Sequence, residues 1–215
     1  MKLLLTSAGL RNAELKQALL DLANVAASKL KVAFIPTAMN VESGDKSWVI
    51  DEMNRLRDMG IAQLDIIDIT ASPKNTWLPR LEESNVIFVN GGNTTYLMER
   101  VTDSGLAAEM PRLLQERLYV GASAGSYIAT PDTRLSSDQT NSVLRGLGLV
   151  PFGIQAHYQN PEFAIAETEA LVRKRARDYP YIVYALDDET AIKVDGESIE
   201  VIGTGQYLVL QPSGP

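Results

Sequence analysis

Short apolar segments recur along the first 130 residues, and most of their positions carry β-branched residues or leucine. Such runs are typical of strands that are buried on both faces of a sheet. We therefore predict five buried strands. Their ranges are Lys2–Thr6, Lys31–Pro36, Gln63–Ile69, Asn85–Asn90 and Leu118–Gly121.

Stretches with helical spacing separate the predicted strands, and their apolar residues recur every three or four positions. Their stripes are Leu15, Leu19, Leu22 and Val25–Ala26; then Val49, Met53, Leu56 and Met59; then Leu97 and Val101; then Leu106, Met110 and Leu113–Leu114. This alternation predicts right-handed crossovers and a doubly wound α/β fold, in which a mainly parallel sheet carries helices on both faces.

The last forty residues follow a different pattern of short runs joined by turns, with one turn at Asp195-Gly196. The runs are Ile182–Leu186, Thr190–Val194, Ile199–Ile202 and Tyr207–Leu210. We predict a small antiparallel appendage at the edge of the sheet. Because the sequence has no repeat, low-complexity segment or long linker, residues 1–215 are expected to form one domain.

Composition narrows the classes of function. With 20 basic and 27 acidic residues the net charge is −7, so nucleic acid is not an expected partner. The absence of cysteine excludes disulfides, thiolate metal sites and a cysteine nucleophile. The apolar run in Met1–Ser7 is too short for a membrane span or a signal-peptide core, so we expect a cytoplasmic protein. Nothing requires a metal or an organic cofactor, and a homodimer is left open.

A serine lies between two glycines in Gly121–Gly125, directly after a predicted strand and before an expected helix at Tyr127–Thr130. This G-x-S-x-G pattern is typical of a nucleophile elbow, in which Ser123 is exposed on a tight turn and the N–H of Ala124 is a natural oxyanion donor. Small residues that only let a helix lie close to the sheet would give the same pattern. The strand–turn–helix context favours the nucleophile.

Two adjacent glycines follow the preceding strand in Asn90–Thr94. In a parallel sheet this strand end and the Ser123 turn open on the same edge. Unobstructed backbone N–H groups there suit the second half of an oxyanion hole. Asn93 is also expected to cap the helix that follows.

The chain has one histidine, His157, between a strand-like segment at Leu149–Ile154 and a turn at Asn160-Pro161. If a Ser–His mechanism activates Ser123, His157 must be the base. The alternative is a hydrogen-bonded structural histidine.

A third group, a carboxylate that orients the imidazole, is expected near His157. Three consecutive acids, Asp187-Asp188-Glu189, follow the run Ile182–Leu186, and one of them turned inward would serve. Asp138 is a rival, and a solvated acidic turn is the alternative for the cluster.

Five segments, in their order and spacing, resemble the peptidase E (aspartyl dipeptidase) and cyanophycinase family of serine peptidases. They are Lys31–Pro36, Asn90–Thr94, Gly121–Gly125, Ala156–Tyr158 and Leu186–Ala191. The resemblance extends over essentially the whole chain. It implies a fold similar to class I glutamine amidotransferases, with serine replacing their cysteine.

The resemblance implies Ser123 as nucleophile, His157 as base, and an oxyanion hole from the main chain of Gly92 and Ala124. It places the third member at Asp188, where relatives often carry glutamate. Glu189 next to it is an alternative acid, and Asp138 matches another acid once considered for that role.

One segment departs from the family pattern. Relatives specific for N-terminal aspartate share a Gly-Glu-Thr-Arg stretch after the histidine, whose arginine is expected to bind the substrate carboxylate. Here the corresponding run, residues 166–169, reads Ala-Glu-Thr-Glu, so Glu169 stands where the arginine is expected. Because two carboxylates repel, specificity for Asp-Xaa peptides is left open, although Arg173 and Lys174 lie one helical turn further on.

We therefore expect a serine exopeptidase that hydrolyses short peptides through a Ser-His-acid triad and an acyl-enzyme. The alternative is a catalytically silent relative that binds a peptide or an amino acid and has a regulatory role.

Overall fold

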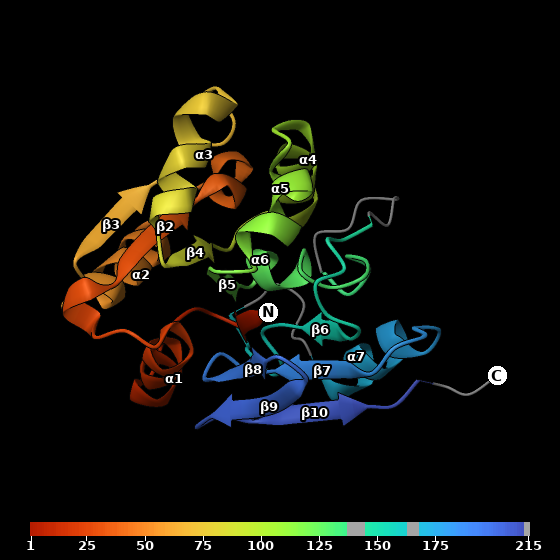
Figure 1. Ribbon diagram of the computed structural model, residues 1–215. Helices are drawn as coiled ribbons and strands as arrows, with labels where there is room; N and C mark the ends of the chain where they lie inside the picture. The colour runs from red at the N-terminus through yellow and green to blue at the C-terminus, as the bar shows by residue number, and fades with distance from the viewer. Residues whose placement is uncertain (137–144, 163–167, 213–215) are drawn as a thin grey trace.

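Strands and helices alternate along the first 130 residues of the computed structural model, which describes residues 1–136, 145–162 and 168–212 (Figure 1). The strands are β1 (Lys2–Thr6), β2 (Lys31–Ile35), β3 (Gln63–Ile66), β4 (Val86–Val89), β5 (Leu118–Ala122), β6 (Gly153–Gln155), β7 (Val183–Leu186), β8 (Thr190–Asp195), β9 (Ser198–Gly203) and β10 (Tyr207–Leu210). The helices are α1 (Ala13–Ala23), α2 (Ser47–Asp58), α3 (Lys74–Glu83), α4 (Thr94–Asp103), α5 (Leu106–Leu113), α6 (Ala124–Tyr127) and α7 (Glu169–Ala176), with short 3₁₀ turns η1 (Ala27–Lys29) and η2 (Thr37–Val41).

Within the described residues, the larger sheet has seven strands in the order β3-β2-β4-β5-β1-β8-β9. The five strands β3, β2, β4, β5 and β1 are parallel, whereas β8 runs antiparallel to β1 and β9 antiparallel to β8. The predicted doubly wound α/β fold is confirmed. All five parallel strands begin and end within three residues of the predicted boundaries.

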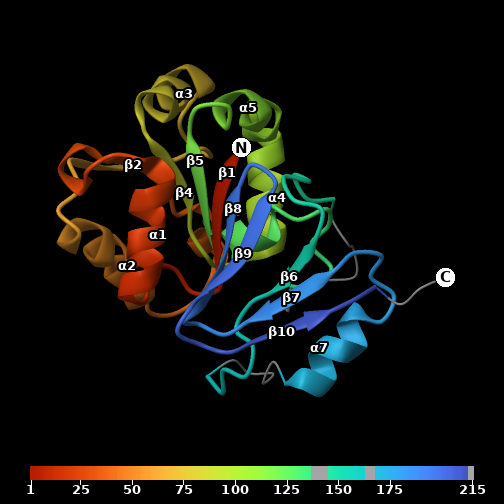
Figure 2. The same ribbon diagram turned by 60° about the horizontal axis from the view of Figure 1, so that its bottom comes forward.

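Helices cover both faces of this sheet, as Figure 2 shows, with α1 and α2 on one side and α4 and α5 on the other. Side chains of α1 and α2, such as Leu19 and Leu56, join one buried apolar cluster. Side chains of α3, α4 and α5, such as Trp77 and Leu97, join the other. Because the parallel strands lie between two apolar layers, their residues are apolar at nearly every position.

The predicted antiparallel appendage at the sheet edge is present as β8 and β9, but the remaining C-terminal strands form a second sheet that the sequence does not predict. Strands β8 and β9 extend the large sheet, while β7 joins a separate sheet in the order β10-β7-β6. There β7 is antiparallel to β10 and parallel to β6. Two sheets form because β7 and β8 are joined by a turn at residues 187–189 that redirects the chain instead of closing a hairpin.

One helix differs from its expected range. The helix expected at Tyr127–Thr130 begins three residues earlier, because α6 follows Ser123 directly. Its first residues, Ala, Gly and Ser, carry no apolar periodicity that could reveal the start. Helix α7 begins at Glu169 and is capped by the Thr168 side chain. No helix in the described part of the chain is both long and apolar enough to span a bilayer.

Candidate active site

Ser123 occupies a strained turn between β5 and α6, with φ of 48° and ψ of −107°. Positive φ is uncommon for residues with a side chain and costs roughly 1–3 kcal/mol. The flanking glycines make the turn sterically feasible. A Cβ on Gly121 would lie 2.7 Å from the Gly125 carbonyl carbon, and one on Gly125 would lie 2.0 Å from the carbonyl oxygen of Val89. Strand β5 and helix α6 therefore approach closely only because both positions are glycine.

The end of β1 supports this turn. The backbone N–H of Ser123 donates to the carbonyl of Thr6 at 3.1 Å, and the Ser126 hydroxyl donates to the same carbonyl at 2.7 Å. The hydroxyl of Thr6 in turn donates to the carbonyl of Gly121 at 2.9 Å. These bonds fix the turn on both sides of Ser123, so its hydroxyl is held at the carboxyl edge, the edge at which the parallel strands end.

The loop after β4 lies beside Ser123, as expected. A Cβ on Gly91 would lie 3.3 Å from the Ser123 Cβ. Gly92 has φ of 126°, and a Cβ there would lie 2.4 Å from the carbonyl oxygen of Ala38, so glycine is required. Asn93 caps α4 by accepting a hydrogen bond from the backbone N–H of Tyr96 at 2.8 Å. Ala124 is the first residue of α6, and its N–H has no acceptor within the helix because helical bonds run four residues back.

His157 follows β6 and reaches the turn from the second sheet. Its Nε2 lies 2.8 Å from the Ser123 hydroxyl. The segment before it is fixed by Tyr127 of α6, whose hydroxyl accepts bonds from the backbone N–H of Ala156 and from the Gln155 amide, both at 2.9 Å. His157 itself has φ of 60°. The histidine is therefore presented to the serine by a turn whose backbone is also in the left-handed region.

Asp188 completes a hydrogen-bonded chain with these two residues. Its Oδ1 lies 2.7 Å from Nδ1 of His157, and the two side chains are only 16% and 12% exposed. Burial raises the pKa of the Asp188 carboxyl, but the bond and charge of His157, with donors from Asn160 and Ser7, outweigh it and hold that pKa below its usual range. Asp188 is thus an anion at neutral pH, where it favours a proton on Nδ1 and leaves Nε2 to face the serine.

The neighbouring acids face elsewhere. Asp187 accepts bonds from the Glu189 N–H at 3.0 Å, from the Thr190 hydroxyl and from the Gln206 N–H, so it organises the turn between β7 and β8. Glu189 binds Arg11 at 3.1 Å and the Asn12 amide at 3.1 Å. The rival acid Asp138 lies outside the described residues. Of the three consecutive acids, Asp188 is the one bonded to His157.

The segment that departs from the family pattern is described from Thr168 onward. Glu169 lies in the first turn of α7 and pairs with Arg173 one turn later, at 2.7 Å between carboxylate and guanidinium. Both side chains are about half exposed. An anionic residue already paired with a cation offers no partner for a substrate carboxylate.

Two residues that contact the His157–Asp188 pair, Ser7 and Asn160, carry no motif that the sequence analysis identified. Ser7 directly follows β1, and Asn160 belongs to the turn that begins at His157. For Ser7 the available signal was its position, because β1 is an interior strand of the sheet whose carboxyl end lies next to the end of β5.

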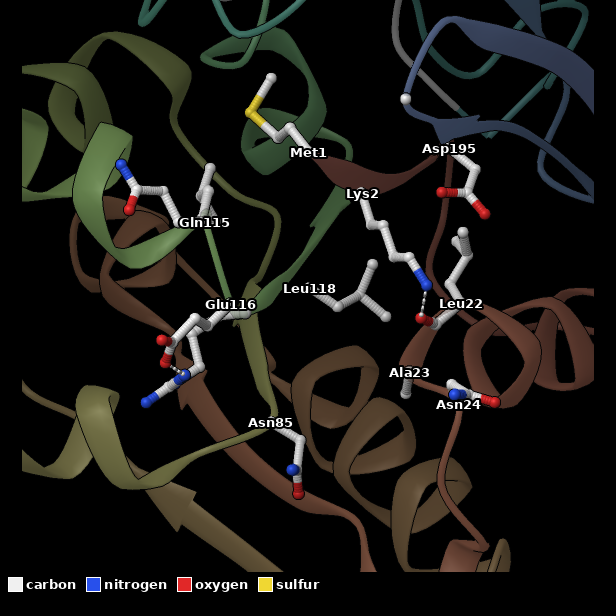
Figure 3. A pocket seen from close by; sticks show the side chains of 13 residues that line it. Met1, Lys2, Leu22, Ala23, Asn24, Asn85, Gln115, Glu116, Leu118 and Asp195 are labelled. Atoms are coloured by element: carbon white, nitrogen blue, oxygen red, sulfur yellow. Dashed lines mark hydrogen bonds and ion pairs between the residues drawn. The ribbon is translucent and has the colours of Figure 1, made fainter.

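Two hollows lie at opposite edges of the large sheet. One, of about 480 Å³, is lined by Tyr158, Asn160, Asp188 and Gln206 among others, beside the His157–Asp188 pair. The other, of about 400 Å³, lies at the amino edge, where the parallel strands begin, and is shown in Figure 3. Lys2, Asn85, Glu116 and Asp195 are among its lining residues.

Comparison with known proteins identifies the family of the chain. The family model described as peptidase family S51 matches residues 3–202. The chain is 33% identical to peptidase E of Salmonella arizonae over 160 residues, which cover 72% of this chain and 67% of that protein. It is 30% identical to a probable alpha-aspartyl dipeptidase of Drosophila melanogaster over 143 residues, or 62% of this chain and 60% of that protein.

A solved structure from Listeria monocytogenes EGD-e has the same fold. It superposes with a TM-score of 0.76 at 24% sequence identity, over 95% of this chain and 98% of that one. This likeness extends through both sheets, since it covers nearly all of each chain.

Proposed function

The chain belongs to peptidase family S51, in which it is a serine-type peptidase similar to peptidase E, and from that premise we propose that Ser123, His157 and Asp188 are its catalytic triad. One observation carries the proposal. An unbroken hydrogen-bonded chain runs from the Ser123 hydroxyl through both ring nitrogens of His157 to the Asp188 carboxylate, at 2.8 and 2.7 Å. These three residues come from three distant segments, so local structure alone does not explain their meeting.

The proposed reaction proceeds through an acyl-enzyme. The Ser123 oxygen attacks the scissile carbonyl carbon while its proton moves to Nε2 of His157, and Asp188 stabilises the imidazolium. Main-chain N–H groups of Gly92 and Ala124 are the proposed donors to the oxyanion. Nε2 then gives its proton to the leaving amine as the C–N bond breaks. Water then attacks the acyl carbon while losing a proton to Nε2. The ester C–O bond breaks, and Nε2 returns that proton to the Ser123 oxygen, which regenerates the enzyme.

The proposed substrates are short peptides, cleaved in the manner of a dipeptidase. The Drosophila relative is named for alpha-aspartyl peptides. In this chain the position expected to recognise an aspartate carboxylate is Glu169, which is paired with Arg173. We therefore propose that residue 169 does not select acidic N-termini, and that any preference for aspartate comes from another residue.

The deciding experiment compares the wild type with Ser123→Ala and, as a matched control, Ser198→Ala on the exposed strand β9. We expect Ser123→Ala to lower kcat by about 10⁵-fold or more and to abolish labelling by a fluorophosphonate, with the midpoint of thermal unfolding preserved. The control should behave as the wild type. Full turnover by Ser123→Ala would refute the triad.

A panel of dipeptides and aminoacyl nitroanilides with acidic, neutral and basic first residues completes the test. Turnover restricted to Asp-Xaa would contradict the proposal about residue 169. If no peptide is cleaved and Ser123 is not labelled, the protein is instead a silent relative that binds its ligand without chemistry.

A further inference from the structure

Ser7 connects both partners of the histidine–carboxylate pair. Its side chain is fully buried at the end of β1. Its hydroxyl accepts a hydrogen bond from the backbone N–H of His157 at 2.7 Å and donates one to Oδ1 of Asp188 at 3.1 Å. One small side chain thus ties the main chain of the base to the same carboxylate oxygen that the imidazole contacts.

Asn160 holds the other oxygen of that carboxylate. Its amide nitrogen donates to Oδ2 of Asp188 at 2.5 Å. The side chain of Asn160 is itself fixed, because its amide oxygen accepts a hydrogen bond from the backbone N–H of Glu162 at 2.8 Å. The backbone N–H of Asn160 donates to the carbonyl of His157 at 3.1 Å. Since both ends of the amide are engaged, its N–H group is aimed at Asp188 before any substrate arrives.

With both donors in place, each oxygen of the Asp188 carboxylate has a protein partner, and the plane of the carboxylate is set by three bonds from Ser7, His157 and Asn160. Asp188 and Asn160 also line the hollow of about 480 Å³. Without the two donors, the carboxylate could rotate toward water in that hollow and lose its alignment with Nδ1. A displacement of about 1 Å in a catalytic group can cost about 100-fold in rate.

We propose that Ser7 and Asn160 are positioning residues of the peptidase, which act through Asp188 and His157 and do not touch the substrate. The inference rests on the proposed triad. It assigns the two residues to the chemical step, because they orient the base and its carboxylate. Substrate binding should therefore be unaffected when either is replaced.

The test uses two pairs of variants that differ mainly in the capacity to hydrogen-bond. Ser7→Val and Ser7→Thr have nearly the same volume, but only threonine keeps the hydroxyl. Asn160→Leu removes the amide that Asn160→Gln retains on a longer stem. Steady-state kinetics and the rate of fluorophosphonate labelling are measured for each folded variant, with Ser123→Ala alongside.

We expect Ser7→Val and Asn160→Leu to lower kcat and the labelling rate together, by about 10- to 100-fold, with KM within about twofold of the wild type. Threonine at position 7 should restore most of the loss. If Ser7→Val does not fold, the kinetics of Asn160→Leu still test the inference, because Asn160 is only half-buried. A KM that rises while kcat is unchanged, or wild-type kinetics in folded variants of both residues, would overturn the inference.

Failure of this inference is distinct from failure of the proposed function. If Ser123→Ala is inactive while the Ser7 and Asn160 variants are fully active, the triad stands and the positioning role is wrong. If Ser123→Ala is active, the triad itself is wrong, and the positioning role with it.

Discussion

The two edges of the large sheet both carry a hollow lined by polar side chains, yet they differ in how those side chains are connected. At the amino edge (Figure 3), Lys2 donates to the carbonyl of Leu22 at 3.0 Å, and Glu116 pairs with the adjacent Arg117. Each contact there completes a helix end or a surface ion pair. At the carboxyl edge, Ser123, His157 and Asp188 form one continuous chain of ionisable and nucleophilic groups. Connectivity between such groups, more than the size of a hollow, distinguishes a site capable of chemistry.

The backbone differs in the same way. At the carboxyl edge Ser123 and His157 have positive φ, and glycines are forced at two positions of the elbow by contacts under 3 Å. At the amino edge Gly196 and Asn24 also have positive φ. A Cβ at position 196 would meet nothing within 4 Å, and Asn24 is the C-cap of α1, where a left-handed asparagine is common. At the carboxyl edge the positive φ therefore falls on two members of the candidate triad, beside glycines that close backbone contacts require.

Asp188→Asn gives the sharpest test of this comparison. An asparagine amide would face the donors Ser7 or Asn160 with its own N–H groups, and it would favour the wrong tautomer of His157. We expect kcat to fall by about 10³- to 10⁴-fold with little change in the midpoint of thermal unfolding.

The matched control is Glu189→Gln, which removes a neighbouring carboxylate that binds Arg11. Its kcat should stay within about threefold of the wild type. If Glu189→Gln lost activity and Asp188→Asn kept it, the acid of the site would be Glu189.

The sequence predicts the parallel strands well because burial on both faces makes nearly every position apolar, as in the run Val86–Val89. It does not reveal α3, which begins after Pro73 and contains Pro79, because prolines obscure the helical pattern around Trp77 and Leu81. The sequence also does not predict that β10 pairs with β7, because the alternation of apolar and polar residues indicates which face of a strand is buried but not which strand lies next to it.

In the candidate site, two residues can be predicted from the sequence alone. Ser123 is indicated by its motif, and His157 is the only histidine in the chain. The choice among three adjacent acids depends on the turn that Asp187 organises, which is a tertiary property. Ser7 and Asn160 are ordinary polar residues in sequence. Only the meeting of β1, β6 and the β7–β8 turn gives them a shared partner in Asp188.

Gly125→Ala and Gly196→Ala compare a glycine that close backbone contacts require, at the carboxyl edge, with one that has open space around it, at the amino edge. The added Cβ at position 125 would lie 2.0 Å from a backbone oxygen of β4, so the elbow must shift. We expect a loss of about 3 kcal/mol in the free energy of unfolding, measured by urea denaturation. At position 196 only the positive φ of 63° is penalised, at about 1 kcal/mol. Equal losses would show that the carboxyl edge is no more constrained than a surface turn.

Buried charge offers a third contrast. Glu52 of α2 is 2% exposed and accepts bonds from the Leu10 N–H and from Arg55, but burial outweighs these partners and raises its pKa above the usual 4.5. Because the folded-state pKa exceeds the unfolded one, the stability from this group is complete at low pH and is lost as pH rises through the folded value. Glutamine cannot ionise, so its variant lacks this dependence.

We therefore expect the free energy of unfolding of Glu52→Gln, relative to that of the wild type, to increase as pH rises above about 4.5. Glu116→Gln at the amino edge is the control. Its side chain is 78% exposed, so this variant removes a carboxylate without changing a buried site. If the free energies of unfolding of Glu52→Gln and the wild type depended on pH in the same way, burial would not raise the pKa of Glu52.

Lys2→Met should have the smallest effect. The substitution keeps the apolar stem of the side chain and removes the donor to the Leu22 carbonyl at the end of α1. One hydrogen bond of this kind contributes about 0.5–1.5 kcal/mol, so we expect a loss near the lower end of that range in urea denaturation, with kcat and KM of the wild type. A tenfold fall in kcat without a larger loss of stability would contradict the separation of the two edges. It would mean that the first residue of β1 affects Ser7 at the other end of the same strand, and that the amino-edge hollow influences the chemistry.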